Sequence, residues 1–252
     1  MDLQQLQQLP TRGQLIQDLW VLAMTGSRSG GFFLEIGSAD GVDLNNTVLL
    51  EREFSWRGVC VEPNPTSFAF LTENRTCICV NKAAWRTSNE NVEFIPRGLL
   101  GAITDVAFGD AHSPARRRHM ATHGTIQVET ISIGDLCETT GVPALFEYLS
   151  LDVEGAELAV LTLWDFDRWR FALATVEHNG SKQTRGGAWG LLAPLGYRRV
   201  QMGFEDWFYH PELLQSLNGG LSIDYDDVTK SFLHLHQARV MERRRLKQPK
   251  GR

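Results

Sequence analysis

Acidic side chains and an imidazole follow two buried, strand-like runs of the sequence. Asp152 and Glu154 come just after YLSL, and Glu177 and His178 come just after FALATV. Neighbouring parallel strands open their carboxyl ends toward one ligand-binding edge, so we expect these groups to converge. An acid that ends a buried strand loses its hydration unless something pairs with it, whereas an imidazole exchanges protons near neutral pH. The pattern predicts a catalytic set in which His178 is the general base, while Asp152 and Glu154 position the base or the substrate.

The same edge allows other interpretations. Asp152, Glu177, His178 and Asn179 carry oxygen and imidazole donors that suit a divalent metal. Purely structural roles are also open: Asp152 as a helix cap, Glu154 as a first-turn helix acid, and His178 as a hydrogen-bonded residue at a strand end. The sequence does not separate these three interpretations, so the metal content stays unknown.

The segment FFLEIGSADG at 32–41 leads an apolar strand into an acid and a glycine turn. Dinucleotide-binding turns follow G-x-G-x-x-G, in which the second glycine lets the backbone approach a pyrophosphate. Here Gly37 is followed by Ala39 where that second glycine belongs, and the next glycine is Gly41. The turn therefore suits S-adenosylmethionine, which contains no pyrophosphate.

Three acids lie near this turn in the sequence. The cationic amino group of S-adenosylmethionine favours a nearby carboxylate such as Glu35 or Asp40. Glu62 ends the next strand, RGVCVEP, and is placed to accept hydrogen bonds from both ribose hydroxyls. Its structural alternative is to cap the helix that begins at Pro65. With the glycine turn, Glu62 favours the ligand-binding interpretation.

The elements around these residues alternate as expected of an α/β fold. The first third predicts strand 32–37, a helix over 43–54 capped by Asp43, strand 57–63, a helix from Pro65 capped by Asn64, and strand 76–85. Later come strands within 148–155 and 171–180, a helix that Gly196 stops, and a closing antiparallel pair, YRRVQM and EDWFYH. This order predicts a mostly parallel sheet with helices on both faces.

Between the two halves of the chain the hydrophobic period weakens. NVEFIP and IQVETISI are expected to be short strands, and AHSPARRRHMATHG at 111–124 is expected to be a mobile loop. Its arginines at 116–118 are either a solvated cluster or a lid that grips phosphate or carboxylate on the substrate.

Composition indicates one globular domain. The chain has 252 residues and a formal net charge of -5, so duplex nucleic acid is not an expected partner. The segment LWVLAM at 19–24 is too short to span a membrane and predicts part of an amphipathic helix. The start lacks a basic secretory signal and the four cysteines lack metal-ligand spacing, so a cytoplasmic location is expected. We expect a helical extension over 1–29, a core over 30–210, and a helix with a basic tail over 211–252.

Two blocks of this sequence resemble the FkbM-type methyltransferases: EIGSADGVDLNNTVLLEREFSWRGVCVEPNP, and YLSLDVEGAELAVL followed by ATVEHNG. The resemblance covers roughly residues 30–210. It implies a class I methyltransferase Rossmann-like fold, with a mostly parallel seven-stranded sheet and an antiparallel closing strand, and S-adenosylmethionine as cofactor. The residues expected to bind the cofactor are Glu35, Gly37, Ser38, Asp40, Gly41, Asn46, Glu62, Pro63 and Asn64.

The predicted function is S-adenosylmethionine-dependent O-methylation of a hydroxyl on a small molecule or glycan. One alternative is a non-catalytic Rossmann-like binding module, although clustered titratable groups at strand ends are unusual in such a module. The other is a nicotinamide-dependent oxidoreductase, which the missing middle glycine disfavours. The sequence gives neither the acceptor nor the oligomeric state.

Overall fold

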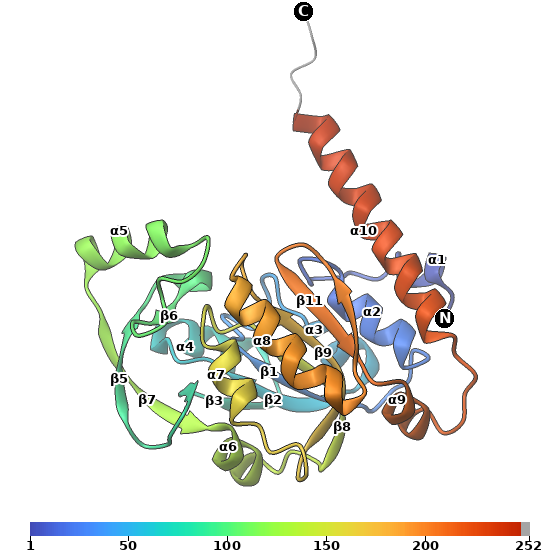
Figure 1. Cartoon of the computed structure of the whole chain (residues 1–252), viewed down its shortest axis with the longest axis horizontal. Coiled ribbons are helices and arrows are strands. Elements are labelled where there is room, and N and C mark those ends of the chain that lie inside the picture. Colours follow the sequence, from blue (N-terminus) through green and yellow to red (C-terminus); the bar gives the residue numbers. More distant parts are fainter. Residues whose placement is uncertain (248–252) are drawn as a thin grey trace, which may run out of the picture.

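A computed structural model describes the backbone of residues 1–247 and the side chains of residues 1–241. Its main sheet has seven strands in the order β10-β11-β9-β8-β1-β2-β3, and only β11 runs antiparallel to its neighbours (Figure 1). This confirms the predicted sheet and its closing antiparallel pair. The strands are β1 Phe32–Ile36, β2 Arg57–Val61, β3 Ile78–Val80, β8 Leu145–Leu151, β9 Arg170–Glu177, β10 Arg198–Gln201 and β11 Glu205–Tyr209.

Both faces of the sheet are covered, which explains the continuous apolar runs in its strands. Side chains alternate along β1, so Leu34 and Ile36 join the core beneath α6, α7 and α8, while Phe33 joins the core beneath α2, α3, α4, α9 and α10. The helices are α1 Leu3–Leu6, α2 Gln17–Met24, α3 Val48–Phe54, α4 Pro65–Asn74, α6 Ile133–Thr140, α7 Glu157–Thr162, α8 Lys182–Leu192, α9 Pro211–Leu217 and α10 Tyr225–Lys247. Asn64 caps α4 and Gly196 follows the last turn after α8, as predicted.

The amino-terminal helix α2 differs from its prediction. It was expected to be amphipathic, but even its polar residues Gln17 and Asp18 are buried. The cause is long-range packing: α10 contacts α2, and the Trp20 ring lies 4.7 Å from that of Trp207 in β11. No described helix is both long and apolar enough to cross a membrane. The basic tail predicted from Arg239 onward lies largely outside the described side chains.

The predicted strand 76–85 is two strands that belong to different sheets. After β3 the chain turns at Asn81, whose side-chain amide donates to the backbone oxygens of Glu62 and Pro63, and then enters β4. A second, four-stranded sheet has the order β4-β7-β5-β6 and lies to one side of the main sheet (Figure 1). Its elements are β4 Ala83–Trp85, β5 Asn91–Ile95, η1 Gly98–Leu100, β6 Ala102–Ile103, α5 Ser113–His123 and β7 Ile126–Ser132. We call residues 83–132 the insertion.

The prediction of a mobile loop at 111–124 is wrong, because Ser113–His123 form helix α5. Only Ser113 and Arg116 of this helix are buried, so its sequence has no row of apolar residues at helical spacing. Arg116 is fully buried and therefore is not part of a solvent-facing lid, whereas Arg117 and Arg118 are exposed. Ion pairing in place of apolar packing attaches this helix to the core.

Helix α3 begins at Val48, five residues later than predicted, and Asp43 does not cap it. The intervening segment is held in an irregular path, with Leu44 at a left-handed φ of 55°. Asn45 Oδ1 accepts hydrogen bonds from the backbone N–H groups of Thr47 and Val48, so Asn45 supplies the cap. The segment is thereby available to line a cavity beside β1.

Candidate active site

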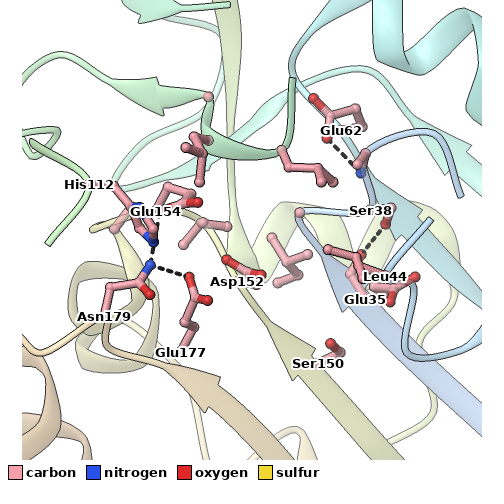
Figure 2. Close-up of a pocket in the computed structure, with 18 of the residues that line it drawn as sticks. Glu35, Ser38, Leu44, Glu62, His112, Ser150, Asp152, Glu154, Glu177 and Asn179 are labelled. Carbon is pink, nitrogen blue, oxygen red and sulfur yellow. Dashed lines mark hydrogen bonds between the residues drawn. The ribbon is translucent and has the colours of Figure 1, made fainter. Parts of the chain in front are cut away.

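A cavity of about 710 Å³ lies at the carboxyl ends of β1, β2, β8 and β9, with residues of the insertion on its opposite wall. Figure 2 shows Asp152 between two groups of side chains. One group comes from the β1 and β2 ends and includes Ser38 and Glu62, and the other includes Glu154, Glu177 and Asn179. The predicted convergence of strand ends is therefore present.

Gly37 joins the two groups through the backbone. It has a left-handed φ of 91°, and a Cβ placed there would lie 2.8 Å from the carbonyl carbon of Asp152, with the oxygen nearer still. The N–H groups of Gly37 and Ser38 both donate to Val61, and that of Asp152 donates to Ile36. The glycine thus lets the turn after β1 pass directly against the residue that ends β8.

Glu35 is buried and its carboxylate is already occupied by protein donors. It accepts hydrogen bonds from Asn45 Nδ2 at 2.7 Å, the Asn46 N–H at 3.0 Å and Thr47 Oγ1 at 2.8 Å. Arg75 lies 3.5 Å away as an ion-pair partner. Glu35 therefore shapes the segment that lines the cavity and has little capacity left for a ligand's amino group.

Asn46 has the free acceptor that Glu35 lacks. Its Nδ2 donates to Ser150 Oγ at 3.0 Å, but its buried Oδ1 has no hydrogen-bond partner in the described protein. Because Asn46 lines the cavity, this oxygen can accept from a cationic amino group.

Glu62 lies at the end of β2, as predicted, and is only 6% exposed. Its Oε2 accepts from the Ala39 N–H at 2.9 Å and its Oε1 from the Asn64 N–H at 2.8 Å. A carboxylate has about four acceptor positions, so two remain for the hydroxyls of a ribose. Burial raises the pKa of Glu62 to about 7.

Three residues expected to bind the cofactor lie outside the lining of this cavity. Asp40 Oδ1 accepts from the N–H groups of Val42 and Asp43, and Asn64 Oδ1 caps α4. Gly41 has a φ of 79° and packs against Arg75. Their roles in this structure are structural, whereas Gly37, Ser38, Asn46, Glu62 and Pro63 line the cavity.

On the other side of Asp152, buried acids crowd together. Asn179 Nδ2 donates to Glu154 at 3.0 Å and to Glu177 at 2.5 Å, and Glu157 accepts from the Gly155 N–H at 3.1 Å. Carboxylate oxygens of Asp152 and Glu177 lie within 4.8 Å of one another. Desolvation by burial raises the pKa of both groups, and the charge of Asp152 raises that of Glu177 further.

Arg116 is the only arginine or lysine in the described chain that forms ion pairs with this cluster. It binds Asp110 at 2.9 Å and contacts Glu154. Arg116 thus pairs with two carboxyl groups, while Asp152, Glu157 and Glu177 have no arginine or lysine ion-pair partner among the described residues. Desolvation and the charge of Asp152 raise the pKa of Glu154 to about 9 despite Arg116, and desolvation raises the pKa of Glu157 to about 7.

The cluster also contains the donor set of a cation site. One carboxylate oxygen from each of Asp152, Glu157 and Glu177 lies within 4.8 Å of the others. Such oxygens suit Mg²⁺, Mn²⁺ or Ca²⁺. The predicted metal ligands Asp152 and Glu177 are thus brought together with Glu157, but His178 is not.

His178 does not reach the cavity, contrary to its predicted role as the base. Its Nδ1 accepts from the Gly180 N–H at 3.1 Å, and its Nε2 faces Asp206 Oδ1 at 3.8 Å. Side chains alternate beyond β9, so Glu177 and Asn179 point into the cavity while His178 lines a separate space near α7 and α8. The imidazole that lines the cavity is His112, which lies in the segment expected to be a loop. No pattern in the sequence singles His112 out.

Sheet order and cavity position define the chain as a class I, Rossmann-like methyltransferase fold. Residues 35–225 match the methyltransferase FkbM domain, and the chain belongs to that family. Membership confirms the resemblance and implies S-adenosylmethionine-dependent methyl transfer. It does not favour the nicotinamide alternative.

Comparison with solved structures finds methyltransferases that are similar to this chain at low sequence identity. A methyltransferase from Pyrococcus furiosus is 12% identical with a TM-score of 0.36, covering 72% of this chain and 76% of its own. Precorrin-6y C5,15-methyltransferase from Geobacter metallireducens GS-15 is 9% identical with a TM-score of 0.39, covering 76% and 84%. Human methyltransferase 10 domain containing protein is 11% identical with a TM-score of 0.38, covering 80% and 84%. A search of curated proteins finds no match.

Proposed function

We propose that this protein is an S-adenosylmethionine-dependent O-methyltransferase whose acceptor is a hydroxyl group on a small molecule or glycan. The observation that carries the proposal is Asp152 Oδ1, a buried carboxylate oxygen without a hydrogen-bond partner in the described protein, on a residue that lines the cavity beside Gly37. A hydroxyl can donate to this oxygen and be oriented by it. The cytoplasmic location and the absence of a nucleic-acid acceptor stay predictions.

The residues on the Gly37 side of the cavity fit the cofactor. The close backbone approach at Gly37 leaves no side chain between the turn and Asp152, Asn46 Oδ1 offers an acceptor for the amino group, and Glu62 offers acceptors for the ribose. When bound, S-adenosylmethionine supplies an electrophilic methyl group. The chain must then align the acceptor and give the hydroxyl proton a destination.

Asp152 is suited to orient an acceptor hydroxyl. Its Oδ1 is buried and has no hydrogen-bond partner in the described protein, and a Glu177 carboxylate oxygen lies within 4.8 Å of an Asp152 oxygen. Glu154 and Asn179 hold Glu177 from the far side, since the Asn179 amide bridges the two acids.

A divalent cation on Asp152, Glu157 and Glu177 is the alternative way to make a hydroxyl nucleophilic, since those oxygens lie within 4.8 Å of one another. The two versions differ in their response to chelation. Transfer that continues in excess EDTA supports the metal-free version, and loss that added Mg²⁺ restores supports the metal version.

The direct test incubates the protein with methyl-labelled S-adenosylmethionine and extracts rich in hydroxylated compounds, followed by mass spectrometry of labelled products. We expect the label on oxygen. Asp152→Asn should lower turnover about ten- to a hundredfold, the worth of one charge-assisted hydrogen bond, while cofactor affinity by calorimetry stays unchanged. The exposed Asp167→Asn is the matched control. Label on nitrogen, or full turnover by Asp152→Asn, contradicts the proposal, and cofactor binding without transfer supports the non-catalytic module.

A further inference from the structure

The insertion supplies the wall of the cavity that faces the acids. It lines the cavity with apolar or glycine residues and a single polar side chain, that of His112; the others within the described chain are Ala83, Ala84, Phe94, Gly98, Leu99, Leu100, Gly101, Ile103 and Ala111. Figure 2 shows His112 on the same side of Asp152 as Glu154 and Asn179. His112 is thus the single polar side chain of an otherwise apolar wall, and it lies on the same side of Asp152 as the acidic cluster.

Backbone contacts fix the position of His112. It is the residue before helix α5, and its carbonyl oxygen accepts from the N–H groups of Ala115 at 3.0 Å and Arg116 at 3.1 Å. Its own N–H donates to Asp110 at 2.9 Å, and the N–H of the preceding Ala111 donates to Asn179 O at 3.1 Å. The chain before α5 is thereby joined to the end of β9.

Arg116, one turn further along, attaches this segment to the cluster. Its buried guanidinium donates to four groups, which are Leu100 O at 3.1 Å, Ala107 O at 2.8 Å, Asp110 at 2.9 Å, and Glu154. Three of these acceptors belong to the insertion, and Glu154 belongs to the segment after β8. Arg116 therefore attaches the segment that carries His112 to the acidic cluster, although the sequence predicts that this segment is mobile.

The ring of His112 is free to react. Neither of its nitrogens has a hydrogen-bond partner among the described residues, in contrast to His178, and the residue is only half-buried. Asp152, Glu154 and Glu177 line the same cavity as His112, and Asp110 accepts a hydrogen bond from the His112 N–H, so carboxyl groups lie close to this ring. A charge on His112 correspondingly acts to lower the pKa of Asp152.

We propose that His112 is the catalytic residue that receives the proton of the acceptor hydroxyl, while Asp152 orients that hydroxyl; this rests on the proposed function. In the step, the O–H bond breaks and its proton goes to a ring nitrogen of His112. The oxygen's electron pair forms the bond to the methyl carbon, and the carbon–sulfur pair stays on sulfur. The imidazolium then gives its proton to water at the half-exposed mouth.

The test compares His112→Gln with the wild type, using labelled S-adenosylmethionine and the hydroxylated extract that the wild type labels. Glutamine keeps a polar side chain but takes up no proton near neutral pH. We expect turnover to fall by about a hundredfold or more, with cofactor affinity and thermal stability unchanged. His123→Gln, an exposed histidine at the other end of α5, is the control that should keep full turnover.

The pH profile gives a readout that a structural role for His112 would not move. The wild type should lose turnover on the acid side of neutrality, and His112→Gln should lack that limb. The titratable or charged groups near His112 are Asp110, Arg116, Asp152, Glu154 and Glu177, and Glu157 lies behind them beside Asp152. They are present in both proteins, so a limb that persists in His112→Gln belongs to them and overturns the assignment.

The outcomes separate the two proposals. If the wild type transfers no label to a hydroxyl, the proposed function falls. If it does and His112→Gln equals it, only the assignment of His112 falls. His178→Gln distinguishes the two imidazoles: loss of turnover in that variant, with His112→Gln active, makes His178 the base after all.

Discussion

Gly37→Ala is the substitution whose effect the structure defines most sharply. An alanine there adds one methyl group at a φ of 91°, a conformation that L-residues rarely adopt. That methyl would also lie 2.8 Å from the carbonyl carbon of Asp152 and closer to its oxygen. The turn after β1 and the end of β8 then have to separate, although each is tied by backbone hydrogen bonds to its neighbours.

The loss of stability in Gly37→Ala has two parts, one from the backbone conformation and one from packing. Left-handed backbone costs a non-glycine residue about 1–2 kcal/mol. Overpacking against fixed backbone adds about 1–3 kcal/mol, so we expect about 2–5 kcal/mol in total. For a chain of this length each kcal/mol lowers the melting temperature by roughly 2–4 °C. Gly30 has a φ of 79° with no atom within 4 Å of its missing Cβ, so Gly30→Ala carries the backbone cost alone.

Thermal unfolding and calorimetry with S-adenosylmethionine measure the difference between the two variants. Gly37→Ala should be less stable than Gly30→Ala and should lose cofactor affinity, because its turn moves away from Asp152 and Asn46. Gly30→Ala should bind the cofactor like the wild type. Equal stability of the two variants, or wild-type affinity in Gly37→Ala, refutes the close approach of Gly37 to Asp152.

Three further results are expected. Burial raises the pKa of each of Glu62, Glu157 and Glu205 to about 7, so the folded state keeps protons that the unfolded state releases. The free energy of unfolding should therefore fall as pH rises from about 5 to about 8, by up to about 3 kcal/mol per group. A melting temperature that climbs over this pH range contradicts the prediction. Arg116→Met removes a buried ion-pair partner and should cost about 3–5 kcal/mol in denaturant unfolding, whereas Arg117→Met, exposed and stacked on Phe108, should cost under about 1 kcal/mol. Glu62→Gln should weaken cofactor binding about tenfold in calorimetry, because ribose hydroxyls donate more strongly to a charged acceptor.

The sequence predicted the main sheet and part of the cavity lining, including Gly37 and Glu62. Continuous apolar runs locate strands that are buried on both faces, and Pro65 or Gly196 mark helix ends through local backbone preferences. Gly37 and Glu62 were found because each acts where its own strand ends. In all these cases the physical cause lies within a few residues of the signal.

Other parts of the site depend on contacts between residues distant in sequence. Arg116 forms an ion pair with Glu154, which lies 38 positions further along the chain. Because only Ser113 and Arg116 of α5 are buried, the helix has no apolar residues at helical spacing that would reveal it in the sequence. The side chain of His178 lies outside the cavity because successive side chains after β9 point to opposite faces. Composition does not reveal which face each residue takes. Asn45 displaces Asp43 as the helix cap because Glu35 binds the intervening segment from β1.

This difference separates the two halves of the cavity in physical terms. The half proposed to bind the cofactor is built from strand ends, where a Cβ on Gly37 would collide with the backbone of Asp152. The half proposed to bind the acceptor includes the insertion wall, where Phe94 and Ile103 are buried core residues but Leu99 is 49% exposed. Backbone oxygens attach the insertion, since Arg116 donates to Ala107 O and the Ala111 N–H donates to Asn179 O. Substitution of the exposed Leu99 side chain removes neither of these bonds, so it should change the surroundings of the proposed acceptor without loosening this attachment.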